Sequence, residues 1–255
     1  MSELAGKTVL LTGASKGIGA AIAAALGAAG AHLVAHYGSD RAGAAEATRD
    51  IPPERLELVG ADLGDLAAVD RLWREALGWR GRIDCLVNNA AVMRLAGGID
   101  DEDAVWDAVW DEALRVNVLA PARLMRNAVR HYLEAGGGIL VTISSWAAQR
   151  GPGNPDLMAY AASKGAILSA TKTIARNYAR NGVLAYMVAP GVVRTRLSEQ
   201  AAERTGGEAA VTAGLAMGEW VPPADIAALV TFLAGGRCRH LSGATLDVNG
   251  ATYIR

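Results

Sequence analysis

The sequence predicts an α/β protein built on one doubly wound, seven-stranded parallel sheet. Short apolar segments rich in β-formers alternate with helical patterns along all 255 residues, as in successive βαβ units. The predicted strands are nearly continuous apolar runs, such as 9–11 and 139–141, which is typical of a sheet with helices on both faces. No linker, repeat or shift in composition divides the chain. We therefore expect a single domain over residues 1–255.

The first half of the chain holds four predicted strands and three helices. The strands are at 8–12, 32–37, 56–59 and 83–87, and the helices at 18–29, 41–50 and 66–77. Asp62 or Asp65 is the candidate N-cap of the third helix, because an aspartate oxygen accepts from the free N–H groups of a first turn.

The second half continues the alternation. Helices are predicted at 103–116, 120–134, 158–180 and 222–233, and strands at 139–143, 183–188 and 244–248. The glycines at 136–138 end the second of these helices. The segment 195–220 has weak periodicity, and we expect an irregular, lid-like insertion there.

Composition excludes several classes of function. The formal net charge is −1 and no basic run is present, which argues against a nucleic-acid partner. The longest apolar stretch, 18–31, is mostly Ala and Gly and too short for a membrane span, and the N-terminus lacks a signal core. Cys85 and Cys238 have no metal-ligand spacing. We expect a soluble, cytoplasmic protein with no metal site and no membrane partner.

Three glycines, Gly13, Gly17 and Gly19, lie between the first predicted strand and its helix. Without a Cβ the backbone turns tightly and approaches a pyrophosphate, which the free N–H groups at the helix start bind. The spacing is G-x-x-x-G-x-G, and the Gly-Lys-Ser/Thr of a P-loop is absent. It indicates a dinucleotide site in a Rossmann-type domain. A tight turn without a ligand is the alternative.

The end of the second predicted strand bears on the choice of dinucleotide. NAD sites usually place an acid there for the ribose 2′-hydroxyl. This chain has Tyr37, and the nearby Asp40 is expected to cap the next helix. Lys16 and Arg41 are placed to pair with a 2′-phosphate, although both also suit a solvated surface. We expect NADP(H), with NAD(H) as the alternative.

Tyr160 and Lys164 are four residues apart in a predicted helix, so their side chains share a face. A free tyrosine, with a pKa of about 10, exchanges protons poorly at neutral pH. A nearby ammonium favours the phenolate, and a shift of about 3 units takes about 4 kcal/mol. The pair is a candidate proton donor and acceptor. Taken alone, such a pair is more often a surface accident.

These motifs and four others make the chain similar to the short-chain dehydrogenase/reductase family. The shared motifs occur in the family's order at 12–19, 88–91, 117, 144–145, 160–164 and 190–191. The resemblance reaches 243–250 and so covers essentially the whole chain. It implies an NADP(H)-dependent oxidoreductase, similar to the 3-oxoacyl-carrier-protein reductases, that interconverts a ketone and a secondary alcohol.

The resemblance also implies a role for each catalytic residue. Tyr160 is the general acid or base, and Lys164 lowers its pKa and binds the nicotinamide ribose. Ser145, rather than the adjacent Ser144, hydrogen-bonds the substrate oxygen. Asn117 holds a water that links Lys164 to solvent.

The cofactor contacts implied by the resemblance run along the whole chain. They are Gly13, Ser15, Lys16, Gly17, Ile18, Gly19, Tyr37, Arg41, Asp62, Leu63, Asn89, Ala90, Ala91, Tyr160, Lys164, Pro190, Gly191, Val193 and Thr195. Trp146 and Trp220 are candidate walls of the substrate pocket, with core packing as the alternative.

The substrate and assembly remain open from sequence. A 3-oxoacyl thioester on an acyl carrier protein, a sugar or polyol, and a small cyclic ketone are all candidate substrates. The family resemblance implies a homotetramer. A non-catalytic NADP(H)-binding regulator and an NAD-dependent polyol dehydrogenase are the alternative functions.

Overall fold

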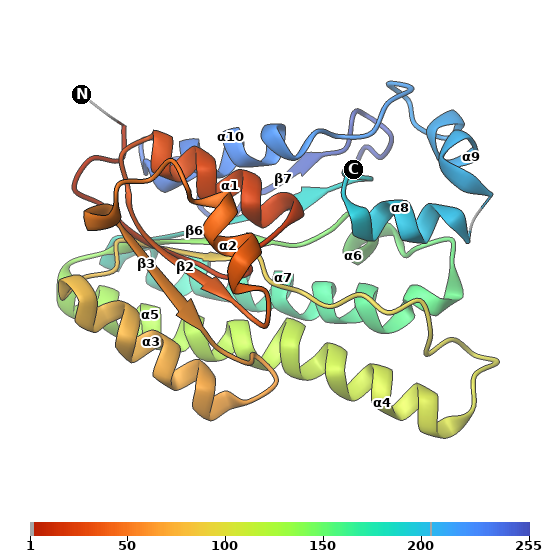
Figure 1. Ribbon diagram of the computed structural model, residues 1–255, viewed down its shortest axis with the longest axis horizontal. Coiled ribbons are helices and arrows are strands. Elements are labelled where there is room, and N and C mark those ends of the chain that lie inside the picture. Colours follow the sequence, from red (N-terminus) through yellow and green to blue (C-terminus); the bar gives the residue numbers. More distant parts are fainter. Residues whose placement is uncertain (1–2, 205) are drawn as a thin grey trace.

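The computed structural model describes residues 3–204 and 206–255, and it confirms the predicted fold class. Seven parallel strands form one sheet in the order β3-β2-β1-β4-β5-β6-β7 (Figure 1). The strands are β1 (Thr8–Leu11), β2 (His32–Tyr37), β3 (Leu56–Gly60), β4 (Cys85–Asn88), β5 (Gly138–Ile143), β6 (Val183–Pro190) and β7 (Thr245–Val248).

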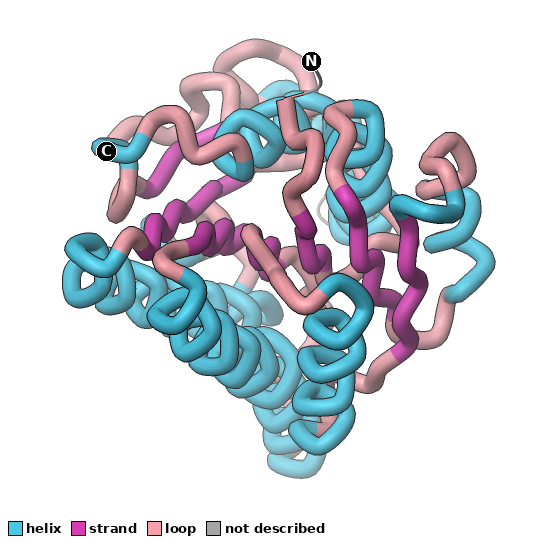
Figure 2. Tube along the Cα trace, turned by 90° about the vertical axis from the view of Figure 1, so that its left-hand side faces the viewer, coloured by secondary structure: helices cyan, strands magenta, loops and turns pink. Residues whose placement is uncertain are grey.

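Helices cover both faces of the sheet, as the apolar strands require (Figure 2). They are α1 (Gly17–Ala28), α2 (Arg41–Ala47), α3 (Leu66–Arg80), α4 (Asp103–Leu114), α5 (Ala120–Ala135), α6 (Ala147–Arg150), α7 (Met158–Tyr178), α8 (Arg196–Glu203), α9 (Gly207–Ala213) and α10 (Pro223–Ala234).

Each face has its own apolar core. On one face, Ile22 of α1 and Val230 of α10 pack with Val9 of β1. On the other, helices α3, α5 and α7 pack against the alternate strand residues, with Leu72 of α3 and Leu124 of α5 fully buried. Burying both faces is the main favourable free-energy term for a sheet of this kind.

The topology places the carboxyl ends of all seven strands at one edge. Strand order reverses between β1 and β4, so the loops after these two strands diverge to opposite sides. A ligand of an open α/β sheet binds in the crevice at such a switch point. The predicted site segments after β1, β4, β5 and β6 therefore meet at this edge.

The two helices predicted at 103–116 and 120–134 are one continuous helical run. A π-helical turn, Arg115–Leu119, joins α4 to α5. Pro121 lies in the first turn of α5 and has no N–H, so the carbonyl of Asn117 lacks its α-helical donor. The sequence pattern suggested a break, but the chain accommodates the proline by widening one turn.

The segment 195–220 is not irregular, as we had expected, because it contains α8 and α9. Thr195 caps α8 by accepting from the N–H of Ser198 at 3.3 Å. Both helices are too short for a clear period. Other differences lie at element ends: α3 runs to Arg80, where left-handed Gly81 ends it, and β6 runs to Pro190.

Candidate active site

The glycine loop after β1 has the backbone that its spacing predicts. Gly13 and Gly17 have φ values of 73° and 56°, which favour glycine. Gly19 is needed for space, because an added Cβ would lie 1.8 Å from the Gly13 carbonyl oxygen and 2.6 Å from Nδ2 of Asn89. The glycines therefore let the loop fold onto the ends of β1 and β4.

The start of α1 fits a pyrophosphate. No side chain caps this helix, and its first turn carries no acidic residue. Its first N–H groups and the helix dipole therefore favour an anion. The Ser15 hydroxyl donates to the Asp40 carbonyl at 2.7 Å, which ties the loop to the start of α2, and Ile18 packs against the core.

We expect Gly19→Ala to abolish dinucleotide binding and to destabilise the fold by several kcal/mol. The added methyl would overlap the Gly13 carbonyl, and relieving the overlap would require the backbone to shift, which costs stability. Gly78→Ala, at an exposed position of α3, is the matched control, since nothing lies within 4 Å of its added Cβ. Titration with dinucleotide and thermal unfolding measure both effects. Wild-type affinity in Gly19→Ala would contradict the role given to this glycine.

The end of β4 holds the glycine loop from the other side. Nδ2 of Asn89 donates to the carbonyls of Thr12 at 2.9 Å and Gly13 at 3.1 Å. The Ala90 N–H donates to Oγ1 of Thr12 at 3.1 Å, and Ala91 follows exposed at the edge. The side-chain amide of Asn88 is buried with no hydrogen-bond partner in the described residues.

The ends of β2 and β3 form the side where the adenosine half of a dinucleotide would lie. Tyr37 is half-buried, and Lys16 and Arg41 are exposed. Oδ1 of Asp40 accepts from the Gly43 N–H at 2.8 Å, so this carboxylate caps α2 as expected. Oδ1 of Asp62 accepts from a neighbouring N–H at 2.8 Å.

Two further predictions at this edge can be compared with the structure. Asp65, not Asp62, is the N-cap of α3, because its side chain accepts from the Ala67 N–H at 2.8 Å. Leu63, between them, is buried in the core on the α3 face and does not lie open at the edge. Only the backbone of Leu63, and not its side chain, is therefore placed to contact a cofactor.

Tyr160 and Lys164 lie on α7 under the end of β5, where Tyr160 is half-buried and Lys164 is buried. The Lys164 ammonium donates to the Ile143 carbonyl at 2.8 Å and lies 5.9 Å from the centre of the Tyr160 ring. Burial lowers the pKa of Lys164 to about 8. A buried amine with this pKa is a common feature of catalytic sites.

The pKa of Tyr160 moves in the opposite direction from our expectation. Burial raises the pKa of its phenol above the ordinary value, and a hydrogen bond with Ser145 offsets part of the rise. Lys164, whose ammonium donates to the Ile143 carbonyl, is not among the causes of this shift. The protein alone therefore keeps Tyr160 protonated, as a proton donor requires.

The structure separates the roles of the two adjacent serines. Oγ of Ser144 donates to the Lys164 carbonyl at 3.2 Å and so anchors α7 to the end of β5. Oγ of Ser145 accepts from the Ala147 N–H at 3.1 Å and is hydrogen-bonded with Tyr160. Ser145 is thus the serine that faces the phenol.

Asn117, in the π-helical turn, connects the loop after β4 to α7. Its Oδ1 accepts from the Val92 N–H at 2.8 Å, and its Nδ2 donates to the Val92 carbonyl at 2.9 Å and to Oγ of Ser163 at 3.0 Å. Both amide hydrogens are used. Any water beside Asn117 must therefore bind its backbone carbonyl or the second lone pair of Oδ1.

The loop after β6 closes the site at the nicotinamide end. The Pro190 carbonyl accepts from the Trp146 N–H at 3.0 Å, and Gly191 packs so closely on Asn249 that an added Cβ would lie 2.7 Å from its Cβ. Val193 is buried. A Cβ on Gly17 would lie 3.2 Å from Cγ2 of Thr195, so Thr195, the N-cap of α8, packs against the glycine loop.

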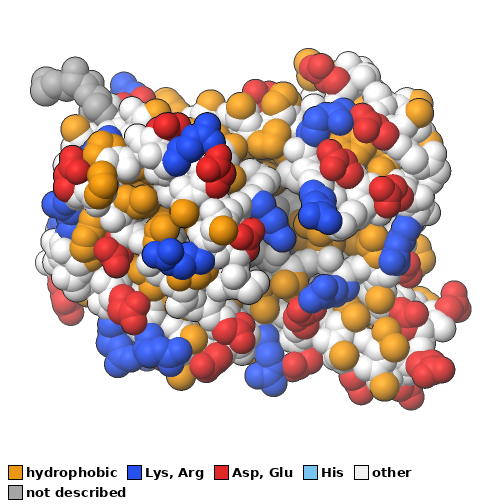
Figure 3. Space-filling model, in the orientation of Figure 1, with side chains coloured by type: hydrophobic (Ala, Val, Ile, Leu, Met, Phe, Trp, Pro, Cys, Tyr) orange, Lys and Arg blue, Asp and Glu red, His pale blue; other side chains and the backbone are white. Residues whose placement is uncertain are grey.

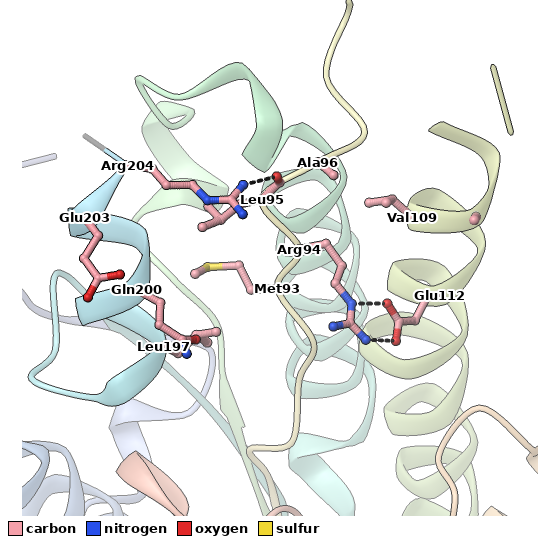
Figure 4. A pocket seen from close by; sticks show the side chains of 11 residues that line it. Met93, Arg94, Leu95, Ala96, Val109, Glu112, Leu197, Gln200, Glu203 and Arg204 are labelled. Carbon is pink, nitrogen blue, oxygen red and sulfur yellow. Dashed lines mark hydrogen bonds and ion pairs between the residues drawn. The ribbon is translucent and has the colours of Figure 1, made fainter. Parts of the chain in front are cut away.

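A groove of about 940 Å³ opens beyond these residues, between the loop after β4, α4 and α8 (Figure 4). Met93 and Leu197 supply apolar walls, and Arg204 spans the groove by donating to the Leu95 carbonyl at 2.9 Å. Arg94 turns away toward α4 and forms two 2.7 Å hydrogen bonds with Glu112, which hold the pKa of that carboxyl below its usual range.

The prediction of a pocket wall is wrong for Trp220 and stays a prediction for Trp146. Trp220 is buried, its Nε1 donates to Oγ1 of Thr212 at 2.9 Å, and the Arg194 guanidinium lies 5.1 Å above its ring. It therefore anchors α9 and is not an open pocket wall. Trp146 is half-buried under the Arg150 guanidinium, 4.5 Å away.

Sequence reasoning missed His36, to which no motif gives a role. Its Nδ1 accepts from the Gly13 N–H at 3.1 Å, and its Nε2 lies 3.0 Å from the Ala61 carbonyl. The only signal in the sequence is a polar residue inside an apolar strand, next to a site residue. Its partners are backbone groups that no motif reveals.

The chain resembles known oxidoreductases over nearly its full length. A family model described as enoyl-(acyl carrier protein) reductase matches residues 13–251. The chain is 33% identical to 3β-hydroxysteroid dehydrogenase 1 of Eggerthella lenta, over 99% of this chain and 95% of the relative. The chain belongs to the short-chain dehydrogenase/reductase family.

Members of this family with different named substrates share the chain's length and fold. The chain is 33% identical to D-threitol dehydrogenase of Mycolicibacterium smegmatis, over 99% of this chain and 95% of the relative. It superimposes with a TM-score of 0.86 on 3-ketoacyl-(acyl-carrier-protein) reductase of Brucella melitensis complexed with NADH, at 28% identity and with 98% of this chain and 99% of that chain covered.

The short-chain dehydrogenase/reductase family is a family of nicotinamide-dependent oxidoreductases, and the fold class and the family expected from sequence are confirmed. None of the helices in the described ranges is long and apolar enough to cross a membrane. The face seen in Figure 3 carries acidic and basic side chains interspersed, without a patch of one sign.

Proposed function

We propose that this protein is an NADP(H)-dependent oxidoreductase that interconverts a ketone and a secondary alcohol. The observation that carries the proposal is Tyr160, hydrogen-bonded with Ser145 and one helical turn from the buried ammonium of Lys164, at the same edge of the sheet as an uncapped helix preceded by a glycine loop. A non-catalytic regulator has no need for a buried lysine with a lowered pKa.

The chain's own groups account for the proton transfer. Tyr160 donates its proton to the substrate oxygen in reduction and accepts it in oxidation. Ser145 donates a hydrogen bond to the same oxygen as negative charge develops on it. Lys164 favours the phenolate left behind and binds the cofactor's ribose. When bound, the nicotinamide supplies or accepts the hydride.

The cofactor is held along the edge of the sheet. The pyrophosphate lies on the first turn of α1, where Gly17, Ile18 and Gly19 leave their N–H groups free of any capping side chain. The nicotinamide half lies between Ala91, Gly191 and Thr195, on the two loops that converge there. The segment 195–220 acts as the lid over this half, which its contact at Gly17 supports.

We expect the protein to prefer NADPH, because Asp40, the carboxylate that follows the end of β2, is already used as a helix cap. Exposed Lys16 and Arg41 are then free to pair with the 2′-phosphate. The double variant Lys16→Ala/Arg41→Ala should lower kcat/KM for NADPH by about tenfold or more and leave that for NADH within about twofold. Arg71→Ala on exposed α3 is the control. A wild-type preference for NADH would refute this assignment.

The substrate is a carbonyl compound that reaches Tyr160 through the groove beside α8. Its mixed apolar and polar lining, with Met93 and Leu197 next to Gln200, suits a ketone that carries an apolar body. Carrier-bound 3-oxoacyl thioesters, cyclic ketones and polyol-derived ketones belong in the test panel, and so does a 2-enoyl thioester. Consumption of reduced nicotinamide with the enoyl compound alone would overturn the carbonyl assignment.

We also propose a cytoplasmic homotetramer. Large apolar side chains are exposed along α4 and α5, among them Trp106, Leu114 and Leu133, and others lie near the C-terminus at Ile254. Burying such residues between copies is a common use of an exposed apolar helix face. Light scattering of the purified protein measures the mass, and a monomer would contradict this proposal.

A further inference from the structure

His36 lies near the end of β2 with a side chain that is almost completely buried, at 2% exposure. Its Nδ1 lies 3.1 Å from the backbone nitrogen of Gly13. A backbone N–H only donates, so Nδ1 must be unprotonated and must accept. The proton then sits on Nε2, which donates to the Ala61 carbonyl at 3.0 Å. The backbone on either side thus selects one neutral tautomer.

Gly13 is clamped on both of its backbone groups. His36 holds its N–H from β2, and Asn89 holds its carbonyl oxygen from the end of β4 at 3.1 Å. This carbonyl packs tightly against the first turn of α1, since an added Cβ on Gly19 would lie 1.8 Å from it. A rotation of Gly13 would therefore move its carbonyl toward the first turn of α1.

The other end of the imidazole fixes a second segment of the site. Ala61 follows β3 and immediately precedes Asp62, and its N–H donates to the Tyr37 carbonyl at 3.1 Å. The His36 backbone contributes as well, because its carbonyl accepts from the Ala14 N–H at 2.9 Å. One residue thus connects the loop after β1 with the segment after β3.

We propose that His36 is a positioning residue for dinucleotide binding, whose neutral imidazole sets the glycine loop and the segment after β3 in register with one another. It touches neither the substrate nor the reacting atoms. This inference rests on the proposed dinucleotide site and adds to it a residue that determines affinity. The loss of either hydrogen bond leaves a backbone group unpaired, which costs more than the bond itself contributes.

The surroundings of His36 keep it neutral. Burial lowers its pKa below the ordinary 6.5, while the hydrogen bond to Ala61 raises it slightly, and no charged side chain contributes to the shift. The charged and titratable groups on the segments that His36 connects are Lys16, Tyr37, Asp40 and Asp62. Those on the other elements packed against β2 are Arg41, Glu46, Glu54, Arg55 and Glu57. Protonation would turn an N–H of the ring toward the Gly13 N–H. Affinity should therefore be constant down to pH 6.5 and fall only as the pH drops through the lowered pKa of His36.

Two variants test this assignment by affinity and kinetics. His36→Leu, which pairs with neither backbone group, should raise the Kd and KM for NADPH about tenfold and leave kcat within about twofold. His36→Gln carries an acceptor and a donor on one side chain and should restore most of the affinity. A merely structural role would not divide KM from kcat in this way. A His36→Leu variant with the wild-type Kd would overturn the proposal.

The pH dependence of cofactor affinity provides a second test, which does not require His36→Leu to fold. The Kd for NADPH is titrated from pH 5 to pH 8 for the wild type and for His36→Gln. The cofactor's own titration cancels in the ratio of the two Kd values, and this ratio should stay constant from pH 8 to pH 6.5, because the buried imidazole remains neutral there. A wild-type affinity that already falls relative to His36→Gln above pH 6.5 would overturn the neutral tautomer, and with it the role of His36, and leave the proposed function intact. A wild type that binds neither NADPH nor NADH would overturn both.

Discussion

Replacing Tyr160 with phenylalanine should reduce turnover by about 10²–10⁴-fold and leave the Kd for NADPH nearly unchanged. The phenylalanine ring fills the same half-buried space, and only the hydroxyl that is bonded with Ser145 is lost. Without it no group in the site donates a proton to the substrate oxygen. Steady-state kinetics with the best substrate of the panel and a separate cofactor titration measure the two effects.

Tyr178→Phe is the matched control, because Tyr178 is half-buried at the far end of the same helix. It should behave as the wild type in both measurements. If Tyr160→Phe keeps wild-type turnover, the assignment of the proton donor is wrong. If it loses cofactor affinity to the same extent as turnover, the hydroxyl serves binding and not proton transfer.

Replacing Lys164 with methionine should lower kcat/KM by about 10²-fold or more and weaken cofactor binding, and yet stabilise the fold. Burial lowers the pKa of Lys164 from 10.5 to about 8, so the folded state holds its ammonium at a cost below pH 8. Methionine removes that cost. After the loss of the hydrogen bond to Ile143, we expect a gain of about 2 kcal/mol at pH 7.

The pH dependence of this gain has a definite sign. The unfolded chain keeps Lys164 charged up to its ordinary pKa of 10.5, whereas the folded protein loses the charge near pH 8. The cost that methionine removes is therefore full below pH 8 and vanishes as the pH rises toward 10.5, so the net gain shrinks and then gives way to the loss of the hydrogen bond to Ile143. Denaturant unfolding at several pH values measures it, with exposed Lys172→Met on the same helix as control. A variant that is less stable and fully active would contradict both halves of the prediction.

The sheet was predictable because its signals are local. Nearly continuous apolar strands alternating with helices specify a covered parallel sheet, and the glycine spacing needs only the backbone of one turn. The π-helical turn at Asn117 was not predictable. Pro121 is typical of the start of a new helix, and a helix that instead widens one turn to accommodate a proline has no sequence signature. Helices α8 and α9 are too short to show their period.

The placement of candidate site residues was predictable where one helix or one loop supplies them, as with Tyr160 and Lys164 on α7. It was not predictable where the environment decides. The pKa of Tyr160 depends on how deeply α7 is buried, which spacing does not give. The role of His36 depends on backbone groups 23 and 25 residues away along the chain, brought together only by the order of the strands.

A crystal structure of the protein with NADPH tests the central claim most directly. We predict the pyrophosphate on the first turn of α1, the adenosine half beside Tyr37 and Asp62, and the nicotinamide ring next to the hydroxyl of Tyr160. A dinucleotide bound elsewhere, or a ring far from that hydroxyl with α8 unable to close the distance, would contradict the account.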